Sequence, residues 1–234
     1  MSSIKAARDA MVRLWPKLLI PYLAAECLHF SLNSFDKSEK SLGYTFTKCL
    51  PIGVLASLCL YLFRCKRSIW SWHTLAVVAS GLGDFLLAYD VLIIGSIAFA
   101  AAHVFYLRTF FRSLKFWFPA LVPIAGLNGI VNAFCFWKLV WKFPLTTGIL
   151  ILYAIVLSFT VWAAISTWRF ASNPQKFSAL LRMGGFLIFA ASDTMIVVNA
   201  FAVELPKSQL LVLSSYYLAQ LLIFLGNLHS EHMI

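Results

Sequence analysis

The stretch LTTGILILYAIVLSFTVWAAISTW, residues 145–168, carries no charged side chain and is long enough to cross a bilayer as one helix. Similar apolar stretches recur near 15–31, 44–63, 69–89, 91–111, 116–136, 178–202 and 209–228. Lipid cannot satisfy open backbone groups, and the stretches are too long for barrel strands. The sequence therefore predicts an all-α, polytopic membrane helix bundle with eight transmembrane helices, and residues 1–234 form a single transmembrane domain.

The composition supports a membrane protein. Hydrophobic residues make up 61% of the 234 residues and charged residues only 12%, whereas soluble domains have roughly 45–50% and about 25%. The net charge of +10 is spread over short clusters between apolar stretches, so it does not indicate a nucleic-acid-binding surface. The five cysteines have no metal-binding spacing.

The basic residues predict the orientation of the chain. Thirteen lysines and arginines fall in the N-terminal segment and after the second, fourth and sixth stretches, and five fall on the other side. The positive-inside rule then places both termini in the cytosol. The first stretch contains Glu26 and lacks a small-residue cleavage site, so we expect it to remain as the first span.

Two aspartates lie inside the apolar stretches, Asp84 in GLGDFLL and Asp193 in AASDTMI. A charged residue at the bilayer centre costs about 2.5–3.5 kcal/mol on insertion scales, and such residues usually face the bundle interior and mark function. We therefore expect both acids to be functional. Burial disfavours a carboxylate anion, while a nearby lysine or hydrogen-bond donor favours it, so two carboxyl groups can divide into a proton donor and an anion.

Several neutral polar residues and one lysine accompany the acids. His103 and Tyr106 are three residues apart, and Tyr216 and Gln220 are four apart, so each pair shares a helix face. The others are Lys48, Tyr153, Ser192 and Tyr217. Such residues often serve only as hydrogen bonds between helices, and a lysine near a helix end also reaches the interface. The same acids would suit a proton-coupled transporter or a lipid carrier. A zinc site needs three converging ligands, and we expect no metal.

The chain resembles the YhhN-like lysoplasmalogenase family of eight-span membrane proteins, and its animal members in particular. The matching stretches are KCLPIGVLA (48–56), GLGDFLL (81–87), GSIAFAAAHVFYLRTF (95–110), GGFLIFAASDTMIVVNAF (184–201) and SSYYLAQLLI (214–223). The resemblance implies hydrolysis of the vinyl ether bond of lysoplasmalogens in the endoplasmic reticulum membrane. The products would be a fatty aldehyde and glycerophosphoethanolamine or glycerophosphocholine. No cofactor is expected, and the partners would be the lysophospholipid substrate and membrane lipids.

The resemblance also implies a set of site residues. Asp84 and Asp193 would be catalytic, with Lys48, His103, Tyr106, Ser192, Tyr216, Tyr217 and Gln220 in support. The family has a methionine after the tyrosine of the sixth span, where this chain reads YAIVLSFTVWAA. This departure puts the carry-over of Tyr153 in doubt.

A vinyl ether is hydrolysed by protonation of the alkene carbon farther from the oxygen, which creates an oxocarbenium ion that water then attacks. This reaction needs a positioned acid and a nearby anion. We expect one aspartate to donate the proton while the other stays ionised, with Lys48 beside Asp84. The hypothesis requires a dry cleft that brings both acids around one lipid. The sequence leaves open which acid is the donor, the side of access, the head-group preference and the oligomeric state.

Overall fold

The computed structural model describes residues 19–33, 41–65 and 67–232, and within these ranges the chain is helical without strands. A helix at Leu19–Leu32 comes first. The helices that follow are α2 (Leu42–Cys65), α3 (Arg67–Ala88), α4 (Leu92–Phe110), the 3-10 turn η1 (Phe111–Ser113), α5 (Phe118–Phe136), α6 (Leu139–Lys142), α7 (Pro144–Phe170), α8 (Asn173–Phe201) and α9 (Ser208–His232). The prediction of an all-α fold is confirmed.

Six helices in the described part are long and apolar enough to cross a membrane: Leu42–Leu62, Leu92–Ser113, Phe118–Phe136, Pro144–Phe170, Asn173–Phe201 and Ser208–Ser230. The chain is therefore a multi-pass membrane protein. The helix Leu19–Leu32 is shorter, and residues 15–18 of the first predicted span lie outside the described residues. α3 has 22 residues but includes His73 and Asp84, which lower its hydropathy. The count of eight spans stays a prediction.

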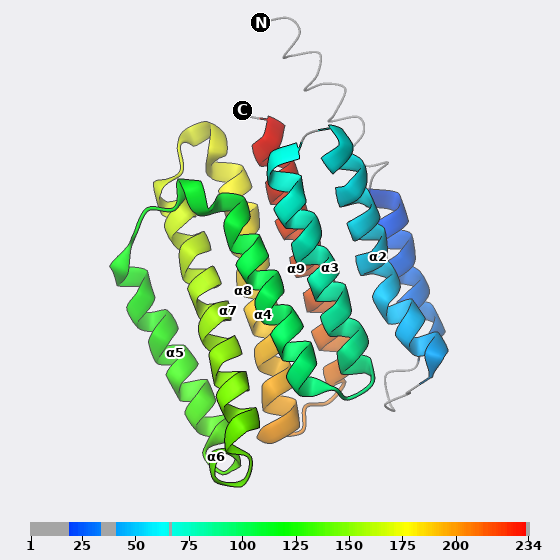
Figure 1. Cartoon of the computed structure of the whole chain (residues 1–234), viewed down its shortest axis with the longest axis vertical. Helices are drawn as coiled ribbons and strands as arrows, with labels where there is room; N and C mark the ends of the chain where they lie inside the picture. Colours follow the sequence, from blue (N-terminus) through cyan, green and yellow to red (C-terminus); the bar gives the residue numbers. More distant parts are fainter. Residues whose placement is uncertain (1–18, 34–40, 66, 233–234) are drawn as a thin grey trace, which may run out of the picture.

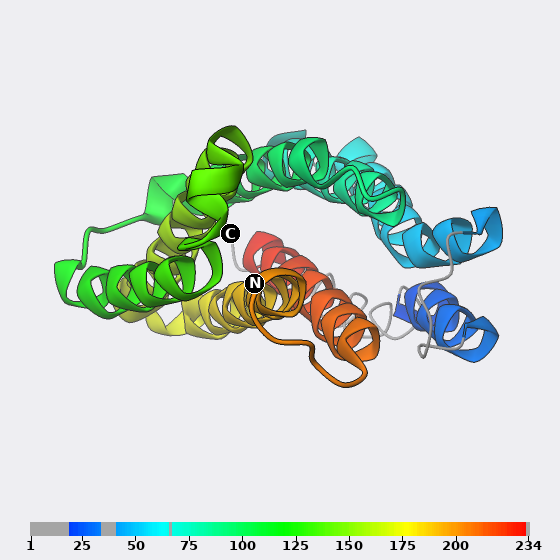
Figure 2. The same cartoon turned by 90° about the horizontal axis from the view of Figure 1, so that it is seen from below.

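Five helices form a closed bundle. α8 packs on α9, α3 on α4, α4 on α7 and α7 on α8, and α3 touches α9. α5 lies outside against α7 and α8, and α2 lies against α3 (Figure 1). The view from below shows α3 and α4 across from α8 and α9, and α2 across from the helix Leu19–Leu32 (Figure 2). Side chains that point inward from these helices therefore meet in one interior.

Helix direction alternates along the bundle. Figure 1 shows the α3–α4, α7–α6 and α8–α9 connections at the bottom and the α7–α8 connection and the end of α9 at the top. Asp90 makes the tight α3–α4 turn possible with a φ of 57°, because aspartate adopts left-handed backbone more readily than most residues.

Two glycines allow α8 and α9 to approach closely. A Cβ added at Gly185 would lie 2.7 Å from Ile223 Cγ1, and one at Gly226 would lie 2.8 Å from the Ser178 carbonyl oxygen. Small residues of this kind promote helix contact in membranes, because lipid surroundings leave no hydrophobic driving force between helices and close packing takes its place. The close approach fixes the relative register of the two helices that carry Asp193 and Tyr216.

Candidate active site

Asp84 lies four residues before the end of α3 and is 3% exposed. Its Oδ1 atom is 3.9 Å from Lys48 Nζ of α2, and the same ammonium group donates to the Asp84 backbone carbonyl at 3.2 Å. Tyr216 of α9 donates from its hydroxyl to Asp84 Oδ2 at 2.7 Å. The expected proximity of Lys48 and Asp84 is confirmed, and this acid has both a cation and a hydrogen-bond donor.

A chain of polar side chains continues from Tyr216 into the bundle. Gln220 Nε2 donates to the Tyr216 hydroxyl at 3.2 Å, and the Tyr106 hydroxyl of α4 donates to Gln220 Oε1. Tyr217 donates from its hydroxyl to the Lys48 carbonyl at 2.7 Å. Tyr106 of α4 thus meets the Tyr216 and Gln220 pair of α9. These hydrogen bonds hold the partner of Asp84 in place.

Asp193 has a different environment. It lies on α8, is 8% exposed, and accepts a hydrogen bond at Oδ2 from the Tyr153 hydroxyl of α7. No lysine or arginine pairs with it among the described residues. Tyr153, whose role the family pattern left in doubt, is the direct partner of this carboxyl group.

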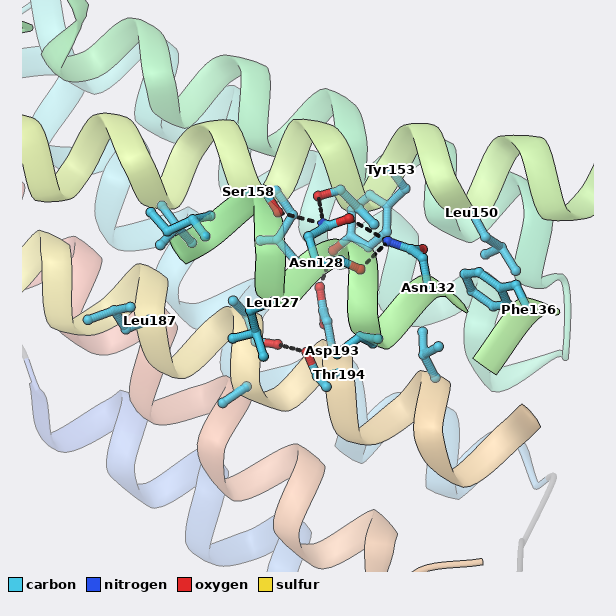
Figure 3. A pocket seen from close by; sticks show the side chains of 18 residues that line it. Leu127, Asn128, Asn132, Phe136, Leu150, Tyr153, Ser158, Leu187, Asp193 and Thr194 are labelled. Carbon is cyan, nitrogen blue, oxygen red and sulfur yellow. Dashed lines mark hydrogen bonds between the residues drawn. The ribbon is translucent and has the colours of Figure 1, made fainter. Parts of the chain in front are cut away.

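A cavity of about 430 Å³ opens beside Asp193, between α5, α7 and α8 (Figure 3). Most of its wall is aliphatic and aromatic, including Leu127, Leu150 and Leu187. Its volume falls in the range of small-molecule sites, which are mainly apolar with a few placed polar groups. Asp84 is not among the residues that line it. This cavity is therefore not the single cleft around both acids that the sequence hypothesis requires.

Sequence reasoning missed the two asparagines on the α5 wall of this cavity. Asn128 Nδ2 donates to Ser158 Oγ at 2.6 Å and to the Ala154 carbonyl at 2.8 Å, and Asn132 Nδ2 donates to the Asn128 side-chain and backbone oxygens. Figure 3 shows Asn128 and Asn132 on the wall of the cavity that faces Asp193. The available signal was two asparagines four apart in an apolar stretch, hence on one helix face.

His103 of α4 lies between the partners of the two acids. It is fully buried, and its ring centre is 4.7 Å from that of Phe189 and 6.0 Å from that of Tyr153. Phe189 in turn contacts Tyr216 at 5.4 Å. Neither His103 ring nitrogen has a hydrogen-bond partner in the described part of the chain. A buried polar group of this kind needs a physical explanation, and hydrogen bonding to a bound molecule would supply one.

Ser192 serves to join helices. Its hydroxyl donates to the Val212 carbonyl of α9 at 2.9 Å. The structure thus brings Lys48, Tyr106, Tyr216, Tyr217 and Gln220 together around Asp84. It places Tyr153 against Asp193, with His103 beside the Tyr153 ring. In the described residues no three His, Cys, Asp or Glu side chains converge as metal ligands would.

The sequence profile of the YhhN family matches residues 43–227, which include both acids and all their named partners. The chain belongs to the YhhN family. Human lysoplasmalogenase TMEM86A is 31% identical over 230 residues, covering 94% of this chain and 91% of that protein. Pig lysoplasmalogenase TMEM86B is 30% identical over 214 residues, covering 90% of this chain and 86% of that protein. No solved structure matches this YhhN-family chain.

Proposed function

We propose that the protein is a lysoplasmalogenase, which hydrolyses the vinyl ether bond of a lysoplasmalogen to a fatty aldehyde and the glycerophospho head group. Relatives that carry this name match over nine tenths of the chain. The observation that carries the proposal is a buried carboxyl group, Asp193, on the wall of an apolar cavity inside a membrane protein. That arrangement suits acid catalysis on a single-chain lipid.

Asp193 is the proton donor in this mechanism. Both acids accept a hydrogen bond from a tyrosine, but Asp193 faces the apolar cavity and has no cationic partner among the described residues. Its apolar surroundings therefore favour the neutral, protonated form more than those of Asp84 do. The Asp193 proton moves to the alkene carbon farther from the ether oxygen, and an oxocarbenium ion forms on the carbon bound to that oxygen. Water adds to that ion and returns a proton to the Asp193 carboxylate. The hemiacetal then collapses to the aldehyde and the free glycerol hydroxyl.

Asp84 supplies a fixed negative charge. Lys48 and Tyr216 both favour the ionised form of this carboxyl group. A preorganised anion in a low-dielectric interior stabilises a cation that develops nearby. Asp84 does not line the cavity, and its partner Tyr216 lies against Phe189 of α8, so we assign this acid electrostatic support of the oxocarbenium ion. The alkenyl chain lies in the cavity between α5, α7 and α8.

We further propose eight membrane crossings, with both termini cytosolic, in the endoplasmic reticulum membrane. In this arrangement the helix Leu19–Leu32 and α3 also cross the bilayer, beside the six helices that qualify by length and composition. Asp84 and Asp193 both lie toward the ends of their helices that meet the 89–91 and 202–207 connections. The reacting groups would therefore be in the half of the bilayer away from the cytosol.

The test is aldehyde release by the purified full chain in detergent with a lysoplasmalogen substrate. Asp193→Asn should lower kcat/KM by at least about 100-fold, the usual range for loss of a general acid. Asp84→Asn should also lower it, because the supporting charge disappears. Asp90→Asn makes the same chemical change in the exposed α3–α4 turn and should leave the rate near that of the unaltered protein. Full turnover in Asp193→Asn would disprove the acid role.

Proton-coupled transport is a second candidate, because the Asp84–Tyr216–Gln220–Tyr106 chain runs through the bundle interior. Reconstitution in vesicles with a trapped pH indicator separates the two functions. Proton flux without aldehyde release would favour the transporter.

A further inference from the structure

A buried arginine near the opposite end of the bundle has no anionic partner in the described part of the chain. Arg182 of α8 is 5% exposed. Its guanidinium donates to Asn227 Oδ1 at 3.3 Å and lies 5.6 Å from the ring centre of Phe110. No described carboxylate is within ion-pair distance. Burial of a charge without a counter-charge is strongly unfavourable, so this position indicates that a negative group binds there.

Arg182 lines a cavity of about 690 Å³ between the ends of α4, α7, α8 and α9. Three further basic residues line it, namely Arg108, Arg112 and Lys115, and no described side chain on its wall is acidic. Basic residues in membrane-protein loops are often only solvated positive-inside charges. Arg182 differs from these because its side chain is buried, so the wall of this cavity carries one buried cation beside the three exposed ones.

The polar groups on the wall suit a phosphate. Ser172 and Gln175 offer side-chain hydroxyl and amide donors on this wall. Arg108 is held over the Trp72 ring at 5.3 Å. Guanidinium groups bind phosphate oxygens through paired hydrogen bonds, and basic pockets between transmembrane helices bind phosphate-bearing lipid heads.

The helix packing leaves room for the Arg182 side chain at Gly226. A Cβ at that position would lie 2.7 Å from Arg182 Cγ and 3.0 Å from the Arg182 backbone nitrogen. The stem of Arg182 therefore passes directly over the α9 backbone, where only a glycine fits. The arginine is thus built into the contact between α8 and α9, and it is not a loop side chain placed by chance.

This cavity is too far from Asp193 to hold the phosphate of a reacting substrate. Arg182 and Asp193 are eleven residues apart on one helix, which corresponds to about 16 Å of rise. Side chains tilt toward the N-terminus of a helix, which moves the guanidinium farther from Asp193. In a lysoplasmalogen five covalent bonds separate the phosphorus from the ether oxygen, a reach of about 7 Å at ordinary bond lengths.

We propose that the basic cavity around Arg182 is a second binding site, which takes a phosphate group from a lipid head or from a soluble phosphate ester. The site is independent of the reaction assigned to the acid pair. Its occupant neutralises Arg182 and joins the ends of α4, α7, α8 and α9.

Binding is measured on the purified full chain by the shift in thermal unfolding temperature. The soluble probes are inorganic phosphate and glycerol 3-phosphate in detergent, and the lipid probe is phosphatidic acid in phosphatidylcholine nanodiscs, against nanodiscs of phosphatidylcholine alone. At least one probe should raise the unfolding temperature, and added salt should weaken the effect of a soluble probe. A shift with either soluble probe identifies a soluble ligand, and a shift with phosphatidic acid alone identifies a lipid head.

Arg182→Gln should raise the half-saturating concentration of the active probe by about tenfold or more, since hydrogen bonds between charged groups are the strong ones. If that variant does not fold, the double variant Arg112→Gln/Lys115→Gln changes only exposed residues of the same cavity and should also weaken binding. Lys138→Gln/Lys142→Gln, at the other end of the bundle, is the matched control. The absence of a shift with every probe, or unchanged binding in the cavity variants, would overturn the proposal.

Discussion

Lys48 brings its ammonium group to 3.9 Å from Asp84 Oδ1 in a buried setting. Removal of one partner of such a pair leaves the other charge unpaired, which typically costs about 3–5 kcal/mol. Lys48→Met should therefore lower the unfolding temperature markedly and reduce aldehyde release. Thermal unfolding followed by tryptophan fluorescence measures the first effect.

The double variant Lys48→Met/Asp84→Asn isolates the pair itself. With both charges gone, the unfavourable buried charge disappears, and the unfolding temperature should recover much of what the single Lys48 change loses. If instead the two single effects simply add, the pair contributes no coupling and the proposed role of Lys48 is wrong.

The Tyr153 hydroxyl donates a hydrogen bond to Asp193 and so orients the carboxyl group toward the cavity. Tyr153→Phe keeps the ring and removes this hydrogen bond. We expect kcat to fall about tenfold, while the unfolding temperature changes little, since a single hydrogen bond contributes about 1 kcal/mol. Tyr89→Phe, at an exposed position, is the matched control, and equal rates in the two variants would contradict the positioning role.

At the scale of the helices, the register of α8 against α9 depends on one of two adjacent glycines. A Cβ on Gly185 would meet Ile223 Cγ1 at 2.7 Å and the Ala219 carbonyl at 3.0 Å, whereas a Cβ on Gly184 would meet nothing within 4 Å. Gly185→Ala should destabilise the protein by about 1–3 kcal/mol, and Gly184→Ala should be neutral or slightly stabilising. Thermal unfolding of the two variants checks the difference, and comparable losses would refute the packing argument.

The cavity between α5, α7 and α8 should select the length of the hydrocarbon chain. Ala154→Trp adds a large side chain to its wall, so kcat/KM for a long alkenyl chain should fall about tenfold, while a short-chain substrate should be affected less. Leu152→Trp changes an exposed position on the same helix outside the cavity and serves as control. An equal effect on short and long chains would show that the chain lies elsewhere.

Apolar length predicts the helices well, and polar ends are where the prediction departs from the structure. α8 begins at Asn173, five residues before the predicted 178, because Pro174 in its first turn and the polar residues that follow are compatible with a helix but not with lipid. Hydropathy measures immersion in lipid, so it cannot detect helical turns that project beyond it. For the same reason, short segments such as η1 and α6 were not predicted.

At the scale of the whole molecule, the membrane orientation is open to a direct test. A glycosylation acceptor placed on a flexible linker within residues 202–207 should be modified in microsomes, because the proposal puts this connection in the lumen. The same insertion at residues 171–172 should remain unmodified on the cytosolic side. The reverse pattern would invert the proposed topology and move the acids into the cytosolic half.

The contacts among the predicted site residues differ in how far the sequence could anticipate them. The depth of Lys48 and Asp84 in adjacent stretches was enough to pair them, since neighbouring helices in sequence are often neighbours in space. The Tyr153–Asp193 contact depends on how α7 crosses α8, and hydropathy carries no information on crossing angle. The Asn128–Asn132 wall was missed because α5 looks like any lipid-facing helix, and Arg182 was counted only among the loop charges.

The unequal helix lengths have a consequence for the host membrane. The 29 residues of α8 rise about 43 Å and the 19 residues of α5 only about 28 Å, against a hydrocarbon core of about 30 Å. α5 just fits, while α8 must tilt or protrude, a mismatch that differs between thin and thick bilayers. Reconstitution in lipids of graded acyl length would shift how far the start of α8 emerges. The thickness of the surrounding membrane thereby becomes a variable that changes access to the Arg182 cavity without altering a single residue.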